Sequence, residues 1–409
     1  MNDIDMKGKE MTSIGSLKGD IKPFTGIFDG QGYTISNAVI NGRDDNGTGF
    51  FGSTSRYDTN TGKTTIIKNF NLDNAIINGE KNVGGIVGMA YKTSIENCSV
   101  TNSTITSVQK RAAGIVANMP ASDPISSVKN CVSKNNVISA CGTGTDGAND
   151  IITFIGAGTV VEDNEYSDNE FNYVAASASS LVSALADNSI NSIKLTKGTF
   201  DFSDIHSTYG NDYGLTISRA VKIVGQGEET IFKFGANGTA ISGQADLMIR
   251  SNNVSIEGIK VITTRNVSGV NAIKVTDTEL SPSTILENIT LKNIIVDGTA
   301  GHAINIHGTK DVVIDGCTFD NYGKCGLGVT ASTNLTVTNS KFKVAACWGD
   351  IGVMKENIAS PRPSTVTVGL GNEFGMGVIY SENASNTITI DESYGFTTST
   401  SGEYVIYSK

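Results

Sequence analysis

Proline, cysteine and basic residues are scarce in this 409-residue chain, and long apolar runs are missing. Its 6 prolines and 46 glycines, set among many Asn, Thr, Ser, Ile and Val residues, fit short strands joined by tight turns and fit long helices badly. No apolar run approaches the roughly 18 residues that a bilayer-spanning helix needs. Basic residues are few and dispersed, with a net charge of −10, which argues against nucleic acid or an anionic membrane as partner. The composition favours an all-β protein.

Cysteine is also sparse, and no two cysteines form a CxxC pair. This spacing gives no support to a zinc or iron–sulfur site, so we expect no metal and no cofactor. Small buried side chains are the simplest interpretation of these residues, and a disulfide stays open as an alternative. The six are Cys98, Cys131, Cys141, Cys317, Cys325 and Cys347.

A short phrase recurs five times between residues 33 and 171, with an aliphatic residue followed two positions later by Asn or Asp. Strands stacked about 4.8 Å apart would bury such an aliphatic column. The Asn side chains would hydrogen-bond one another and the backbone at each bend. The pattern predicts a β-solenoid. The aligned pairs are Ile35 and Asn37, Ile67 and Asn69, Ile95 and Asn97, Val128 and Asn130, and Val161 and Asp163.

A second phrase alternates with the first and pairs two apolar residues between small ones. Gly49-Phe50-Phe51-Gly52 and Gly85-Ile86-Val87-Gly88 closely resemble the GLUG motif of bacterial surface proteins, and residues 114–117 and 153–156 resemble it loosely. Residues 3–35 resemble the entry region before such repeats. The resemblance, over about 3–171, implies a surface protein and a chain that starts within a longer one, so the polar start at Met1 is uninformative about location.

The pattern changes near residue 173. Residues 175–188 have the spacing of a short amphipathic helix, and residues 193–200 and 221–227 resemble the opening of pectin-lyase-like β-helix domains. That resemblance, over about 175–409, implies a helix near 177–188 that caps the solenoid end. We therefore expect a right-handed parallel β-helix in two tandem segments, residues 1–173 and 174–409.

Two strand patterns repeat in the second half. One places Ile256, Leu291, Ile314, Val337, Val368 and Ile390 in a column, at intervals of 22 or 23 residues or longer where a loop intervenes. The other recurs at 272–275, 303–306, 326–329 and 351–353. Side chains alternate along a strand, so the second pattern directs Lys274, Thr276, Asn305, His307, Gly328, Thr330 and Gly352 outward.

This outward face is where β-helix polysaccharide enzymes carry their sites, but an acid–base set is missing. Hydrolases need two carboxylates, and Gly301-His302-Ala303 matches only one of the three phrases typical of the class. Lyases need a Lys or Arg base and commonly a calcium site, and Lys274 stands without an acidic cluster. We interpret His302 and His307 as surface or turn residues, and Trp348, beside the apolar stretch 344–347, as a core or loop-packing residue.

The sequence thus favours a non-catalytic surface or secreted protein, an adhesin or glycan-binding module that binds a polysaccharide or a surface glycan. A polysaccharide lyase or hydrolase with loops at 262–270, 277–288 and 343–363, and a passive spacer, stay open. Nothing calls for an oligomer, and a monomer is the simpler expectation. No catalytic residue is assigned, and the candidate ligand-binding residues are Lys274, Asp277, His302, Asn305, His307, Lys355 and Glu356.

Overall fold

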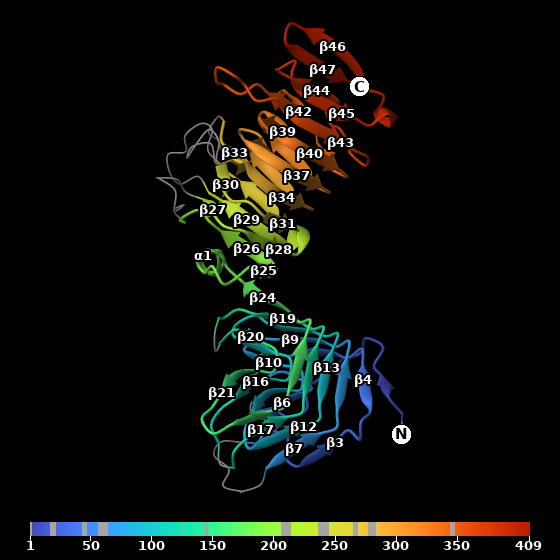
Figure 1. The fold of residues 1–409 in the computed structure, drawn as a ribbon, viewed down its shortest axis with the longest axis vertical. Helices are drawn as coiled ribbons and strands as arrows, with labels where there is room; N and C mark the ends of the chain where they lie inside the picture. Colours follow the sequence, from blue (N-terminus) through green and yellow to red (C-terminus); the bar gives the residue numbers. More distant parts are fainter. Residues whose placement is uncertain are drawn as a thin grey trace. The chain divides into compact units, whose positions relative to one another are not determined.

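The structure is a computed structural model that divides into two compact units, Met1–Ala175 (unit 1) and Ala176–Lys409 (unit 2). Almost every element is a short β-strand, and the pairing is parallel apart from the last hairpin (Figure 1). This arrangement confirms the predicted all-β, parallel β-helix fold. The described residues are 2–16, 22–42, 47–55, 64–122, 124–143, 146–205, 214–235, 245–264, 269–276, 284–343 and 348–409.

Unit 1 packs up to five short strands into each turn of its solenoid. Strands one turn apart pair in parallel, so that β12 lies between β7 and β17. One column of strands is β1 (Ile4–Asp5), β4 (Thr34–Ser36), β8 (Asn71–Asp73), β13 (Ser99–Thr101), β18 (Val132–Lys134) and β23 (Glu165–Ser167). The next is β2 (Glu10–Met11), β5 (Val39–Asn41), β9 (Ile76–Gly79), β14 (Thr104–Ser107), β19 (Val137–Ala140) and β24 (Glu170–Ala175). The others are β10 (Asn82–Gly84), β15 (Arg111–Ala113) and β20 (Ala148–Asn149); β6 (Phe51–Thr54), β11 (Val87–Ala90), β16 (Val116–Met119) and β21 (Ile152–Ile155); and β3 (Ile27–Asp29), β7 (Thr65–Lys68), β12 (Thr93–Glu96), β17 (Ser127–Lys129) and β22 (Val160–Glu162).

Asparagine and aspartate form the corners between these strands, because they adopt the left-handed backbone region more easily than most residues. Asn69 and Asn97 both have a φ of 51°. The Asn97 side-chain amide donates to Asn69 Oδ1 at 3.2 Å, and Asn69 donates to Asp29 Oδ1 at 3.0 Å. The predicted Asn ladder is therefore confirmed along these turns.

The first copy of the repeat was aligned wrongly by the sequence pattern. Ile67 pairs with Phe28 rather than Ile35, and Ile35 pairs with Leu72. The later members of the column, Ile67 through Val161, are in the predicted register. The fourth glycine phrase is likewise displaced, since Val116 pairs with Ile152 and not with Ile155.

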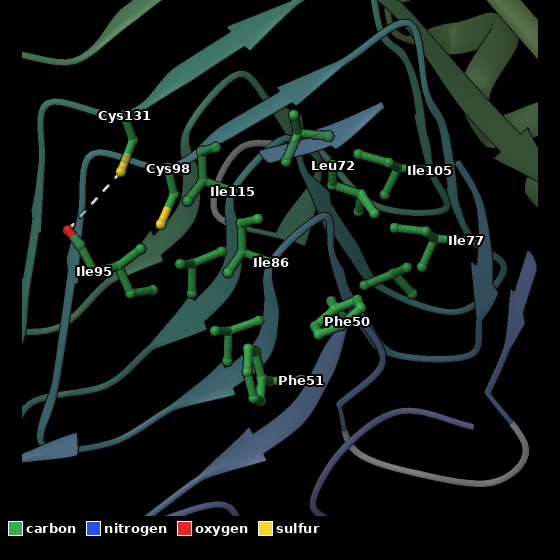
Figure 2. Close-up of a cluster of buried hydrophobic side chains, with 14 of the residues drawn as sticks. Phe50, Phe51, Leu72, Ile77, Ile86, Ile95, Cys98, Ile105, Ile115 and Cys131 are labelled. Carbon is green, nitrogen blue, oxygen red and sulfur yellow. Dashed lines mark hydrogen bonds between the residues drawn. The ribbon is translucent and has the colours of Figure 1, made fainter. Parts of the chain in front are cut away.

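The glycines of the GLUG-like phrase stand where successive turns approach most closely. A Cβ atom on Gly85 would lie 2.1 Å from the Gly114 carbonyl oxygen, so only glycine fits. The apolar residues beside them, such as Phe50, Ile86 and Ile115, point into the solenoid and form its core with the aliphatic ladders (Figure 2). The phrase thus combines close backbone contact with a buried apolar column.

Unit 2 opens with helix α1 (Ala178–Ala186), which confirms the helix predicted near 177–188. Ser177 begins it with a capping box in which Ser177 Oγ accepts from Ser180 N at 3.2 Å and Ser180 Oγ accepts from Ser177 N at 3.0 Å. At its other end Arg219 donates to the carbonyl oxygens of Ala184 and Leu185, both at 2.9 Å. These bonds satisfy helix ends and hold α1 at the first turn of unit 2.

The rest of unit 2 is a solenoid of three sheets, whose strands pair in parallel except for β47 and β46 at the end of sheet three. Sheet one contains β25 (Ser192–Leu195), β28 (Val221–Val224), β31 (Val254–Glu257), β34 (Leu286–Lys292), β37 (Thr309–Asp315), β40 (Thr333–Thr338), β43 (Thr365–Val368) and β45 (Thr387–Ile390). Sheet two contains β26 (Gly198–Asp201), β29 (Thr230–Phe234), β32 (Lys260–Thr263), β35 (Ile295–Thr299), β38 (Thr318–Tyr322) and β41 (Lys341–Phe342). Sheet three contains β27 (Leu215–Ile217), β30 (Ala245–Ile249), β33 (Asn271–Val275), β36 (Ile304–His307), β39 (Cys325–Thr330), β42 (Gly349–Met354), β44 (Val378–Ser381), β47 (Tyr404–Ser408) and β46 (Thr397–Ser401), and two 3-10 turns, η2 (Gly227–Glu229) and η3 (Glu392–Tyr394), lie between strands.

The aliphatic column predicted from Ile256 to Ile390 runs along sheet one in the predicted register. Most of the described cysteines are buried as well. Cys98, Cys131, Cys317 and Cys325 are buried and Cys141 is partly buried, and none of these five forms a disulfide, while Cys347 lies outside the described residues. Small buried side chains are therefore the confirmed interpretation for four of them.

Candidate functional site

Sheet three of unit 2 carries the outward-facing residues that the sequence singled out. Successive strands pair Lys274 with Asn305, Asn305 with Gly328, Gly328 with Gly352, and Gly352 with Tyr380. We call these five residues the outward column. Their neighbours in each strand, such as Ile273 and Val275, are fully buried, which agrees with the predicted alternation. Thr276 and Thr330, however, are buried rather than exposed.

Aromatic rings cover the two glycines of the outward column. A Cβ atom on Gly328 would lie 2.8 Å from His302 Nδ1, and one on Gly352 would lie 2.6 Å from the Tyr380 hydroxyl oxygen. A larger residue at either position would therefore have to displace the ring that occupies the space above it. The two rings give this face an aromatic surface that the sequence pattern did not predict.

His302 is the more deeply buried of the two rings, with 3% of its surface exposed. Burial, and secondarily the charge of Lys324, lowers the pKa of His302 to about 4, so the imidazole is neutral at pH 7. Its ring centre lies 6.2 Å from that of Trp348, edge to face. His302 is therefore not a surface residue: it lies in the connection before β36, and its ring fills the space above Gly328.

His307 belongs to a charged cluster formed with Lys274, Glu356 and Arg362. His307 Nε2 lies 3.5 Å from Glu356 Oε1, and Arg362 Nε donates to both Glu356 oxygens at 3.2 and 3.1 Å. These bonds from Arg362 lower the pKa of the buried Glu356 carboxyl to about 2. Burial lowers the pKa of His307, against an opposing pull from Glu356 and with a smaller contribution from Lys274.

An aromatic pocket opens beside the last strands of the same sheet and has a volume of about 320 Å³. Half of the Trp348 surface and half of the Tyr404 surface is exposed, whereas Tyr380 is largely buried. Lys324 Nζ lies 5.0 Å above the centre of the Trp348 ring, a cation–π contact from the preceding turn. The pocket is lined by Trp348, Val378, Tyr380, Glu382, Tyr404 and Ile406.

Half of the Trp348 surface is exposed, so the expectation of a core residue is wrong, although one side of the ring packs against His302 and Lys324. Sequence reasoning missed Tyr380, Glu382 and Tyr404 altogether. Tyr380 and Glu382 continue the outward alternation of β44, a signal that could have been followed one turn further. Tyr404 enters through β47, which pairs antiparallel with β44, and the repeat pattern contains no trace of that pairing.

The candidate residues from the sequence thus separate into groups. The structure brings Lys274, Asn305, His307 and Glu356 to one region, while His302 lies beside Trp348. Lys355 leans toward the pocket: its backbone N–H donates to Glu382 Oε2 at 3.2 Å, and its Nζ pairs with Glu403 at 2.6 Å. Asp277 lies outside the described residues.

The described part of the chain lacks two further features. No group of three or more His, Cys, Asp or Glu side chains there is placed to hold a metal ion. No helix there is both long enough and apolar enough to cross a membrane.

Comparison with protein families and curated proteins gives two local matches. The GLUG motif matches residues 79–106, which lie within unit 1 and contain the phrase Gly85-Ile86-Val87-Gly88. A stretch of 114 residues, 27% of this chain, is 32% identical to halomucin of Haloquadratum walsbyi and covers 1% of that protein's length.

Among solved structures, the A-modules of the Azotobacter vinelandii mannuronan C-5 epimerases AlgE4 and AlgE6 are similar over 93% of this chain. The similar region spans 86% of the AlgE4 chain and 87% of the AlgE6 chain, with sequence identities of 12% and 11% and TM-scores of 0.23 and 0.22. Tailspike protein 3 of bacteriophage CBA120 is similar over 96% of this chain and 55% of its own, at 11% identity and a TM-score of 0.21. With TM-scores this low, the fold assignment rests on the strand pairing of the chain itself.

Proposed function

We propose that this chain is a non-catalytic, glycan-binding part of a bacterial cell-surface or secreted protein. The observation that carries the proposal is the aromatic pocket, in which Trp348 and Tyr404 are half exposed. Large aromatic side chains that stay exposed on a rigid scaffold are costly in water, and their flat apolar faces suit the CH face of a sugar ring. Trp348 directly precedes β42 and Tyr404 begins β47, so two strands of sheet three position these rings.

The proposed location is supported by the repeats of unit 1. The GLUG motif at 79–106 and the likeness to halomucin favour a surface or extracellular protein. The resemblance of the glycine phrases to those of bacterial surface proteins points the same way. A pectin-lyase-like origin for unit 2 stays part of the proposal.

The absence of catalysis is proposed from the chemistry of the charged cluster. Hydrolysis requires one carboxyl group that is protonated near neutral pH, so that it can donate a proton to the leaving oxygen. Glu356 has a pKa of about 2 because Arg362 holds its ionised form, so it cannot act as that acid. The carboxylate instead binds Arg362 and lies 3.5 Å from His307 Nε2 of β36.

The chain contains one tryptophan, so its fluorescence reports on the aromatic pocket directly. We expect titration with a binding glycan from a panel of plant and host polysaccharides to change Trp348 emission. In calorimetric titrations, Trp348→Ala and Tyr404→Ala should each weaken binding at least about tenfold. Tyr166→Ala, a matched control at an exposed aromatic residue of unit 1, should leave it unchanged. Binding unaltered by Trp348→Ala, or no binding to any member of the panel, would contradict the proposal, and the latter would favour a passive spacer.

A polysaccharide lyase is a second candidate because of His307. Burial lowers the pKa of its imidazole and so favours the neutral form, and Lys274 and Arg362 lie near it, a combination able to take a proton from an acidic sugar. The same panel should therefore be examined for unsaturated sugar ends. Product formation that His307→Ala abolishes would establish this alternative.

A further inference from the structure

The charge of the aromatic pocket restricts the sugars that fit it. Among the described residues that line the pocket, Glu382 is the one with a charged side chain. Its Oε2 accepts only a backbone N–H, that of Lys355, and no basic side chain among the described residues forms an ion pair with it. The nearby Lys355 ammonium group is directed to Glu403. Among the described residues, the pocket thus presents a carboxylate without an ion pair beside three aromatic rings, and the nearby Lys324 ammonium group lies over the face of the Trp348 ring.

We propose that the pocket takes a neutral hexopyranose unit and excludes uronate and sulfated sugars, an inference that rests on the proposed function. A carboxylate is an acceptor with several lone-pair sites, and it is well suited to two neighbouring sugar hydroxyl groups. An anionic sugar would instead place a like charge near Glu382 in a partly desolvated site, which is unfavourable.

The size and shape of the pocket agree with this ligand class. A volume of about 320 Å³ is at the small end of the range for small-molecule sites, so it suits one or two sugar rings rather than a long chain. Tyr404 and Ile406 project from one strand, and Val378 and Tyr380 project from its antiparallel partner. The apolar floor that they form fits the CH face of a ring, while Glu382 at the margin is available to the hydroxyl groups.

The test compares matched oligosaccharides by Trp348 fluorescence and calorimetry. The probes are neutral gluco- and galacto-oligosaccharides and their uronate counterparts of equal length and linkage, at low and high salt. We expect the neutral member of a pair to bind at least about tenfold more tightly at low salt. The difference should narrow at high salt because screening weakens the repulsion. Glu382→Gln should further reduce the difference in affinity between the neutral and the uronate sugar, and Glu382→Lys should reverse the preference. Glu165→Gln in unit 1 should leave both affinities unchanged.

The possible outcomes separate this inference from the proposed function. Equal or tighter binding of a uronate, lost in Trp348→Ala, would overturn the ligand class and keep the glycan-binding function. A neutral preference that survives Glu382→Lys would overturn the role of Glu382. Failure of every pair to bind would overturn both proposals. Circular dichroism of each variant checks that the β-helix is intact.

Discussion

Acidification should destabilise unit 2 through His302. Burial lowers the pKa of this imidazole from its ordinary 6.5 to about 4, and unfolding restores the ordinary value. Above pH 6.5 both states are neutral and His302 adds no pH dependence. Between pH 6.5 and 4 the unfolded chain binds a proton at His302 and the folded chain does not. The free energy of unfolding therefore decreases as the pH decreases. Each pH unit in this window is worth about 1.4 kcal/mol, which gives a total loss of about 3 kcal/mol that is complete below pH 4.

Chemical denaturation of the wild type and of His302→Gln, followed from pH 8 to pH 4, measures this loss. The substitution will also change packing above Gly328, so the informative quantity is the difference between the two proteins as a function of pH. Subtracting the free energy of unfolding of the variant from that of the wild type removes the contributions of the carboxylates and of the other histidines. The remaining difference should decline by about 3 kcal/mol from pH 7 to pH 4. His307→Gln is the matched control, and it should alter the slope less because Glu356 partly supports protonated His307. Parallel stability curves for wild type and His302→Gln would refute the reasoning.

Three further substitutions test the scaffold. Asn97→Ala should cost about 1–2 kcal/mol of stability, because it loses a ladder bond and places alanine at a φ of 51°, while Asn97→Gly should cost less; thermal unfolding of the pair distinguishes these causes. Gly328→Ala should lower the melting temperature because its methyl group meets the His302 ring, and adding His302→Ala should restore part of the loss. Glu356→Gln should weaken the contact with Arg362 and raise hydrogen exchange in residues 355–364, and unchanged exchange there would contradict a structural role for the pair.

The repeated part of the fold was predictable because stacking imposes the same requirement at every turn. The columns through Ile67 and Ile256 must be aliphatic, and the corner at Asn69 must tolerate a positive φ. The error at the first copy has a physical cause. Each turn of unit 1 contains two similar corners, Asn69 and Asn74, and a strand before either corner has the same local pattern. The sequence that ends at Asn37 therefore resembles a strand of the neighbouring sheet. The Asn37 side chain accepts a hydrogen bond from Asn74, the second corner of the next turn, rather than from Asn69.

The candidate site was predicted only where it obeys the repeat. Lys274, Asn305 and His307 occupy outward positions as expected because strand alternation fixes them. The burial of His302 depends on the missing Cβ of Gly328, one turn away, and a single-strand pattern cannot express that relation. Glu356 was among the predicted candidates, but its hydrogen bonds to Arg362 and its position 3.5 Å from His307 depend on a segment outside the repeat, which strand alternation does not specify.

The position of the aromatic pocket follows from where repetition ends. Inside the stack each outward residue has a neighbour in the turn above and the turn below, about 4.8 Å away, so a large ring is accommodated only where an adjacent position is small, as with His302 over Gly328 and Tyr380 over Gly352. After β44 the parallel stack of sheet three gives way to the antiparallel strand β47. That strand does not have to match a further turn, so Tyr404 can remain half exposed. A ligand-binding surface at the last turns is therefore compatible with a regular solenoid, whereas the same residues placed mid-stack would require compensating glycines on both sides.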